Sequence, residues 1–408
     1  MRNELRITNA TPRRSTAARA ALLALPLAVL LAASGCARDD RIDPPPIAPA
    51  LQAELETWLA EHGRPPADYV MGLFAGRDVV LLGEMHRFRH DELLVQSLIP
   101  RLREAGVTAL ATEFARREDQ ALLDSLVTAP EWNENLGREI IFRQFMAWGF
   151  REYVDILKAV WRTNRDRPAG EAPLRVLGVN NSFDFGHIRT EADRDDPEVW
   201  RRVAGGQTEA DWAGPVLAEV ARGGKVLGHC GIHHAFTGFR QPRVVGGEYK
   251  GPGGLRFGNR LREELGERAV TVFLHAPWNT AAGYDAVHVH PADGRLDAFM
   301  LARDGGPFAV GFDTAPSPLG GLPIANAVYG HGRDPFTMAD FCDGWIYTLP
   351  VGDYEPVAYI EDWIDEGNME AARASAMNPR WRAMSVEQLN AGCRSYLDDH
   401  ERFYGRLR

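Results

Sequence analysis

Residues 79–90 read Val-Val-Leu-Leu-Gly-Glu-Met-His-Arg-Phe-Arg-His. The short apolar run predicts a buried β-strand that stops at Gly83. Glu84, His86 and His90 follow at once and bring one carboxylate and two imidazoles to the end of that strand. Ligands of open α/β sheets bind at the carboxyl ends of the strands, and glutamate and histidine are frequent general bases and metal ligands. This stretch therefore predicts a functional site in an α/β fold.

The rest of the chain alternates short apolar runs with amphipathic stretches, which is typical of a sheet covered by helices. Strands are predicted at Val79–Leu82, Thr108–Thr112, Leu174–Val179, Lys225–Leu227, Ala269–Leu274, Phe308–Phe312 and Trp345–Leu349. Helices are predicted at Asp91–Ala105, Arg138–Arg162 (one helix or two), Leu255–Leu265, Met369–Ala376 and from Ser385 onward. We expect an α/β domain over residues 51–350 with a central, largely parallel sheet flanked by helices. Residues 351–408 are predicted to form a helical extension for packing or dimerisation.

Chemically capable side chains follow six consecutive predicted strands. They are Glu84 and His86, then Glu113, then Asn180 and Asn181, then His229, His233 and His234, then His275, and finally Asp313. Helix capping explains Asn or Asp at such positions but not repeated Glu and His. Because parallel strands place their carboxyl ends at one edge of a sheet, we expect these side chains to gather there.

Such a group of residues is typical of a hydrolytic site, in which a carboxylate activates water and a histidine transfers a proton. The predicted catalytic residues are Glu84, His86, Glu113 and His234, with Glu84 or Glu113 as the base. The predicted ligands of a divalent metal such as Mn, Co or Zn are His86, Glu113, His229 and His233. No HExxH, GxSxG, GxGxxG or P-loop motif is present, which argues against zincin, serine-hydrolase and nucleotide-binding chemistry.

A glycine-rich segment follows the histidine cluster. Residues 246–254 read Gly-Gly-Glu-Tyr-Lys-Gly-Pro-Gly-Gly. This composition predicts the absence of a regular element. The segment is interpreted either as a flap over the site or as a plain surface loop.

The N-terminus has the order of an export signal. Five arginines precede an apolar stretch from Ala20 to Ala33, and Ser34-Gly35-Cys36 follows. This order predicts a signal peptide over residues 1–35, with Cys36 lipidated as in bacterial lipoproteins. The proline-rich residues 36–50 are expected to act as a tether. We expect a protein anchored by lipid in the bacterial cell envelope, in the outer membrane facing the periplasm; an ordinary secreted protein is the alternative.

The charge of the chain restricts its partners. The formal net charge is −10, and it becomes −14 once the five arginines and one glutamate of residues 1–35 are removed. So acidic a body argues against binding nucleic acid or anionic lipid headgroups. The expected partner is a small-molecule or peptide substrate, as the family resemblance described next implies.

Two motifs resemble a known family. The run Leu82-Gly83-Glu84-Met85-His86, then His90, an amphipathic helix and Thr112-Glu113 with Gln120, resembles the ChaN-like haem-uptake lipoproteins and their superfamily relatives, the TIKI/TraB metalloproteases and the erythromycin esterases. Trp148 and Tyr153 fit the ChaN-like spacing. Gly231 to His234 resembles the G-x-x-H of the protease branch, whereas His229 with a second histidine soon after resembles the esterase branch. The resemblance covers about residues 79–239.

The resemblance and the residues leave two functions open. The esterase and protease relatives imply hydrolysis of an ester or amide bond by the Glu and His residues, with or without a metal. The ChaN-like relatives imply a binding protein that takes up haem or an iron complex without turnover. A scaffold that has lost activity is a third interpretation.

Overall fold

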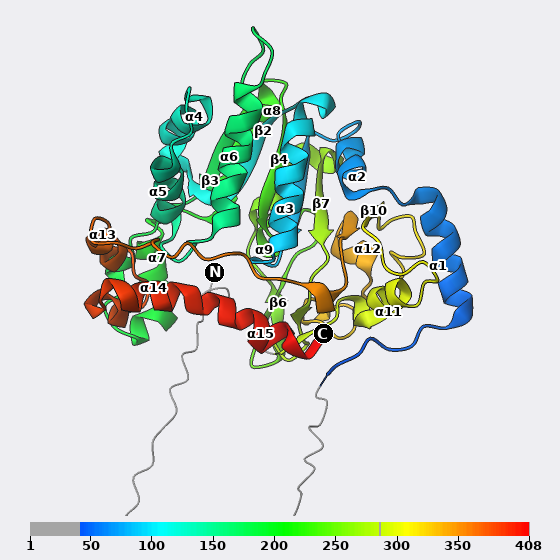
Figure 1. The fold of residues 1–408 in the computed structure, drawn as a ribbon. Coiled ribbons are helices and arrows are strands. Elements are labelled where there is room, and N and C mark those ends of the chain that lie inside the picture. Colours follow the sequence, from blue (N-terminus) through cyan, green and yellow to red (C-terminus); the bar gives the residue numbers. More distant parts are fainter. Residues whose placement is uncertain (1–40, 285–286, 408) are drawn as a thin grey trace, which may run out of the picture.

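The computed structural model describes residues 41–284 and 287–407, and the predicted signal peptide and Cys36 lie outside them (Figure 1). A seven-stranded sheet forms the centre of the molecule. Its strands are β1 (Val79–Glu84), β2 (Val107–Arg116), β3 (Arg175–Asn180), β4 (Lys225–Gly231), β7 (Ala269–Leu274), β10 (Val310–Asp313) and β11 (Gly344–Tyr347), in the order β10-β11-β7-β1-β4-β2-β3. All neighbouring pairs are parallel except β10 with β11. The predicted largely parallel α/β sheet is confirmed.

Helices cover both faces of the sheet (Figure 1). They are α1 (Pro49–His62), α2 (Pro66–Leu73), α3 (Arg89–Leu98), α4 (Gln120–Thr128), α5 (Glu134–Gln144), α6 (Arg151–Arg165), α7 (Pro197–Val203), α8 (Ala213–Ala221), α9 (Ile232–Ala235), α10 (Phe257–Leu265), α11 (Arg295–Leu301), α12 (Met338–Phe341), α13 (Met369–Ala374), α14 (Val386–Arg394) and α15 (Asp398–Tyr404). Successive residues of β1 divide between two apolar clusters: Val79 and Leu81 join one, and Val80 and Leu82 join the other. This division follows from the alternation of side chains along a strand that is buried on both faces.

Asp313 does not reach the edge where the sequence predicted it. Strand β10 runs antiparallel to β11, so its carboxyl end lies at the opposite edge from those of β1, β2 and β4. There the Asp313 carboxylate accepts a hydrogen bond of 2.9 Å from the hydroxyl of Tyr69. The expectation that six strand ends meet was wrong for this strand because strand direction depends on chain connections rather than on local sequence.

The glycine-rich segment is a regular element, contrary to the prediction. Strands β5 (Pro242–Val245) and β6 (Glu248–Pro252) form an antiparallel hairpin, in which Val245 pairs with Glu248. Gly246 and Gly247 connect them with φ values of 59° and 78°. Two consecutive positive φ angles match the twist of a tight two-residue hairpin turn. The two glycines therefore make the hairpin rather than preventing it. A second small pair joins β8 (Trp278–Asn279) to β9 (His288–Val289).

Both ends of the described chain meet near the C-terminal helices. Helices α14 and α15 run across the lower side of the molecule in Figure 1. The helix predicted from Ser385 onward is present as α14, and a capping box of Ser385 and Gln388 begins it. In the predicted tether, the amide of Ile42 donates to the carbonyl of Arg406, and its carbonyl lies 3.0 Å from Nε2 of His290. Residue 42 is thus held against the folded body. Within the described residues, no helix has the length and apolar character needed to cross a membrane.

Candidate functional site

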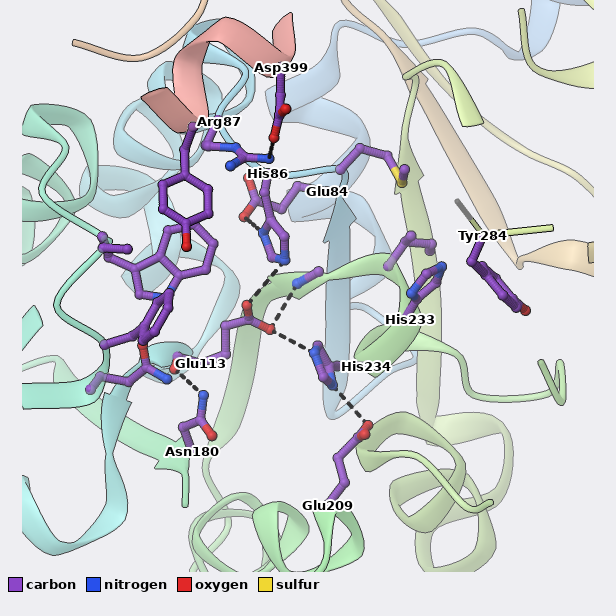
Figure 2. Close-up of a pocket in the computed structure, with 18 of the residues that line it drawn as sticks. Glu84, His86, Arg87, Glu113, Asn180, Glu209, His233, His234, Tyr284 and Asp399 are labelled. Carbon is purple, nitrogen blue, oxygen red and sulfur yellow. Dashed lines mark hydrogen bonds and ion pairs between the residues drawn. The ribbon is translucent and has the colours of Figure 1, made fainter. Parts of the chain in front are cut away.

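The carboxylate of Glu113 lies at the centre of the site, between two imidazoles (Figure 2). Oε1 of Glu113 lies 3.5 Å from Nε2 of His86, and Oε2 lies 3.6 Å from Nε2 of His234. The amide of Gly231 donates a hydrogen bond of 3.0 Å to Oε2. Three elements supply these groups: β2, the turn after β1, and the junction of β4 with α9. The two long distances leave Glu113 available to a water or a substrate atom placed between it and the rings.

His86 reaches Glu113 through an unusual turn of the backbone. His86 and Arg87 have φ values of 58° and 66°, a left-handed conformation that is uncommon for residues other than glycine and that marks functional turns when it is held in place. Glu84 is the last residue of β1, and its Oε1 lies 2.7 Å from Nδ1 of His86. The hydroxyl of Tyr153 receives a hydrogen bond from the amide of Arg87 and lies 3.4 Å from the same carboxylate. These contacts fix the plane of the His86 ring.

His234 is held in the same way by a residue that sequence analysis missed. Its Nδ1 lies 3.0 Å from Oε1 of Glu209, whose other oxygen lies 2.7 Å from Nη1 of Arg256. Glu209 begins the 3₁₀-helix η5 (Glu209–Trp212). Burial opposes ionisation of Glu209, but the charges of His234 and Arg256 outweigh it and lower its pKa to about 2. Glu209 follows no strand, so no pattern in the sequence marks it as part of the site.

A cavity of about 330 Å³ opens over Glu113. Its walls are rich in aromatic and amide side chains, among them Trp148, Trp212, Tyr284, Asn180 and Asn181. The C-terminal extension forms part of the wall through Tyr396, Asp399, Arg402, Phe403 and Tyr404, and Asp399 lies 3.6 Å from Arg87. The sequence predicted only a packing role for the extension and missed that the extension lines the pocket. Aromatic residues on a predicted helix do not reveal which cavity they line. Its role in dimerisation stays a prediction.

His229 lies beneath the pocket rather than in it. Its partner across the ladder is Leu82, so its side chain shares a face of the sheet with Glu84. Glu92 of α3 covers this face, and Nε2 of His229 lies 3.3 Å from Oε2 of Glu92 and 3.7 Å from Oε2 of Glu84. All three side chains are fully buried and together form a group that could hold a metal ion. Burial and the charge of Glu84 raise the pKa of Glu92 well above its usual value.

Three other histidines point away from Glu113. His90 packs against Tyr354, with ring centroids 4.2 Å apart, and burial lowers its pKa to about 3. Nε2 of His233 lies 2.7 Å from the Tyr329 hydroxyl, at the side of the pocket. His275 contacts Asp297 and Trp345 in the interior. Of the four metal ligands predicted from the sequence, only His86 and Glu113 meet each other in the described structure.

The chain matches the model of one protein family. Residues 70–187 match the family described as "Haem-binding uptake, Tiki superfamily, ChaN". The match covers less than a third of the chain, and over this segment the chain is similar to that family. The ChaN-like segment contains Glu84, His86 and Glu113, and the resemblance predicted from the two motifs is confirmed. The segment ends before Glu209 and His234, so the family model does not cover the second half of the site. No curated protein matches the chain.

Solved structures are similar to this chain at low sequence identity, and two with TM-scores of 0.50 and 0.51 share its fold. A Bacillus cereus protein has a TM-score of 0.50 at 12% identity, covering 76% of this chain and 99% of that chain. A succinoglycan biosynthesis protein has a TM-score of 0.51 at 11% identity, with the same coverage. An erythromycin esterase in its open conformation has a TM-score of 0.42 at 12% identity, covering 68% of this chain and 92% of that chain. At these identities the likeness concerns the fold alone.

Proposed function

We propose that this protein is a hydrolase of an ester or amide bond. The observation that carries the proposal is the meeting of two imidazoles at Glu113, each imidazole held by its own buried carboxylate. Acyl hydrolysis needs a base that takes a proton from water and an acid that gives a proton to the leaving group. This pocket supplies both kinds of group on the floor of one cavity.

In the proposed reaction each group has one role. Glu113 takes a proton from a water molecule, whose oxygen then adds to the acyl carbon. His86 or His234 gives a proton to the departing oxygen or nitrogen, and the carboxylates of Glu84 and Glu209 orient those rings and stabilise their protonated form, as an acidic partner does for a catalytic histidine elsewhere. The acyl–oxygen or acyl–nitrogen bond breaks, and the products are a carboxylic acid and an alcohol or amine.

Replacing Glu113 by glutamine tests this proposal. A panel of small esters and short peptides is offered to the wild type, to Glu113→Gln and to Glu118→Gln. Glu118 is an exposed carboxylate in the 3₁₀-helix that follows the same strand. We expect kcat/KM to fall at least about 100-fold in Glu113→Gln, since a positioned general base contributes about that much or more, and to stay unchanged in Glu118→Gln. Hydrolysis that survives in a folded Glu113→Gln protein contradicts the proposed role of Glu113.

Haem capture is the competing function, because the matching family model is described as haem-binding. Proteins bind haem iron through a histidine nitrogen, a tyrosine oxygen, or a methionine or cysteine sulfur. Both ring nitrogens of His86 and of His234 face carboxylates, and Nε2 of His233 faces Tyr329. These three histidines would have to break such a contact to bind iron, whereas Tyr284, Tyr396 and Tyr404 also line the pocket. No catalytic step is assigned to haem. A saturable Soret change on titration with haem, lost in His234→Ala, favours capture instead.

The same proposal includes an anchor in the outer membrane through lipidated Cys36, facing the periplasm. Its support is the order of the arginines, the apolar stretch and the small residues before the cysteine. We expect the wild type to partition with membranes and to incorporate labelled fatty acid, Cys36→Ser to lose both properties, and Ser34→Ala to keep them. Unchanged partitioning of Cys36→Ser contradicts the anchor.

A further inference from the structure

The buried group beneath the pocket has more acceptors than the protein satisfies. Oε2 of Glu84, both carboxylate oxygens of Glu92 and both ring nitrogens of His229 have no hydrogen-bond partner among the described residues. All three side chains have an exposed fraction of 0%. Buried polar atoms without partners are rare in folded proteins and cost free energy. A missing occupant that accepts electron pairs from all three side chains would account for them.

The distances within the group suit a metal ion. Nε2 of His229 lies 3.3 Å from Oε2 of Glu92 and 3.7 Å from Oε2 of Glu84. Tetrahedral zinc with ligands at about 2.0–2.1 Å separates those ligands by roughly 3.3–3.4 Å. We propose that Glu84, Glu92 and His229 bind one divalent transition metal ion, with Zn²⁺ as the ion that fits best. Two carboxylates and an imidazole are ligands that zinc accepts.

Charge supports the same assignment. Two glutamates, one from β1 and one from α3, bring their carboxylates close together in the buried interior. Buried carboxylates without compensating charge are strongly unfavourable. A divalent cation neutralises both, whereas without it the group must retain protons on Glu92 or His229. A shared proton is therefore the competing occupant, and metal analysis distinguishes the two.

This metal site differs from the set of four metal ligands predicted from the sequence. A metal ion bound here would position the His86 ring through Glu84. Glu84 lines the pocket, whereas Glu92 and His229 do not. Oε1 of Glu84 already faces His86, which leaves Oε2 for the metal. The ion would hold Glu84 and, through it, the His86 ring, without touching the substrate. The proposed metal site does not depend on the proposed hydrolysis. Only the positioning of His86 for catalysis rests on the proposed function.

Metal analysis of the full-length protein tests the site. The wild type, Glu92→Gln and Glu113→Gln are stripped with a chelator, loaded with Zn²⁺ alone and dialysed. We expect about one zinc per chain in the wild type and in Glu113→Gln, and at least a tenfold lower content in Glu92→Gln, because a neutral amide is a poor zinc ligand. The wild type also gains thermal stability on Zn²⁺ addition, since a ligand that binds only the folded state stabilises it.

Cobalt provides a readout that does not depend on a variant's folding. Co²⁺ loaded into the wild type is expected to show the intense visible absorption of a tetrahedral ion, displaced by Zn²⁺. A wild type that retains no zinc overturns the site, as does zinc that persists in Glu92→Gln. The two proposals fail separately: zinc binding without hydrolysis leaves the metal site standing, and hydrolysis by a protein that cannot bind zinc leaves only the proposed function.

Discussion

Gly231 lies directly against the ring of His86. A Cβ atom at Gly231 would lie 2.7 Å from both Cε1 and Nε2 of the imidazole. The amide of the same residue donates to Glu113. One glycine at the end of β4 thus holds the central carboxylate through its backbone and leaves room for the histidine that approaches it. The proposed mechanism depends on this close packing.

Gly231→Ala is expected to displace His86 and reduce turnover. The added methyl group must push the ring away from Glu113, and misplacement of a catalytic group by about 1 Å costs roughly 100-fold in rate. We expect kcat to fall by about that factor while the protein stays folded. Gly238→Ala is the matched control, since a Cβ there has no atom within 4 Å. Equal kinetics of the two variants contradict the proposed position of His86 in the reaction.

Glu209 is expected to make stability depend on acid pH. Its pKa falls from 4.5 to about 2 in the folded protein, so its contribution is fully present above pH 4.5 and is lost as pH falls toward 2. A shift of this size corresponds to roughly 3 kcal/mol at about 1.4 kcal/mol per pH unit. Denaturant unfolding of the wild type and of Glu209→Gln across this range measures the difference.

The comparison of slopes isolates Glu209 from the other acids. Glu209→Gln removes the carboxylate that faces Arg256, so this variant is less stable than the wild type above pH 4.5. Its stability should fall less steeply below pH 4.5 and approach that of the wild type toward pH 2. Parallel curves for the two proteins contradict an ionised Glu209 in the folded state. Glu118→Gln, at an exposed position, serves as the control and should follow the wild type.

Phe403 is expected to contribute to substrate binding from the C-terminal extension. It lines the pocket from α15 and lies far from Glu113 along the chain. Loss of an apolar contact of about 1–2 kcal/mol raises KM by roughly 5- to 30-fold in Phe403→Ala, with kcat little changed, because the contact is made equally in the ground and transition states. Leu301→Ala, at an exposed position outside the pocket, is the control. An unchanged KM in Phe403→Ala would place the substrate away from this wall.

Local sequence patterns were enough to predict that Glu84 and Glu113 belong to the site. Glu84 and Glu113 each come at or near the carboxyl end of a buried apolar strand, and parallel strands bring such ends together. The apolar runs also predicted all seven strands of the main sheet, since burial on both faces requires continuous apolar residues. Strand direction was beyond these patterns, and so Asp313 was placed at the wrong edge.

Only the tertiary structure decided which histidines meet which carboxylates. His229 and His234 are five residues apart, yet one faces the buried Glu92 and the other faces Glu113. That division depends on which face of β4 His229 takes and on the direction of α9, which carries His234. Glu92 and Glu209 come from an α-helix and a 3₁₀-helix, and neither follows a strand directly. The sequence by itself determined the strand ends because periodicity is local, whereas the partners of those residues arise from contacts between distant segments, which no local pattern records.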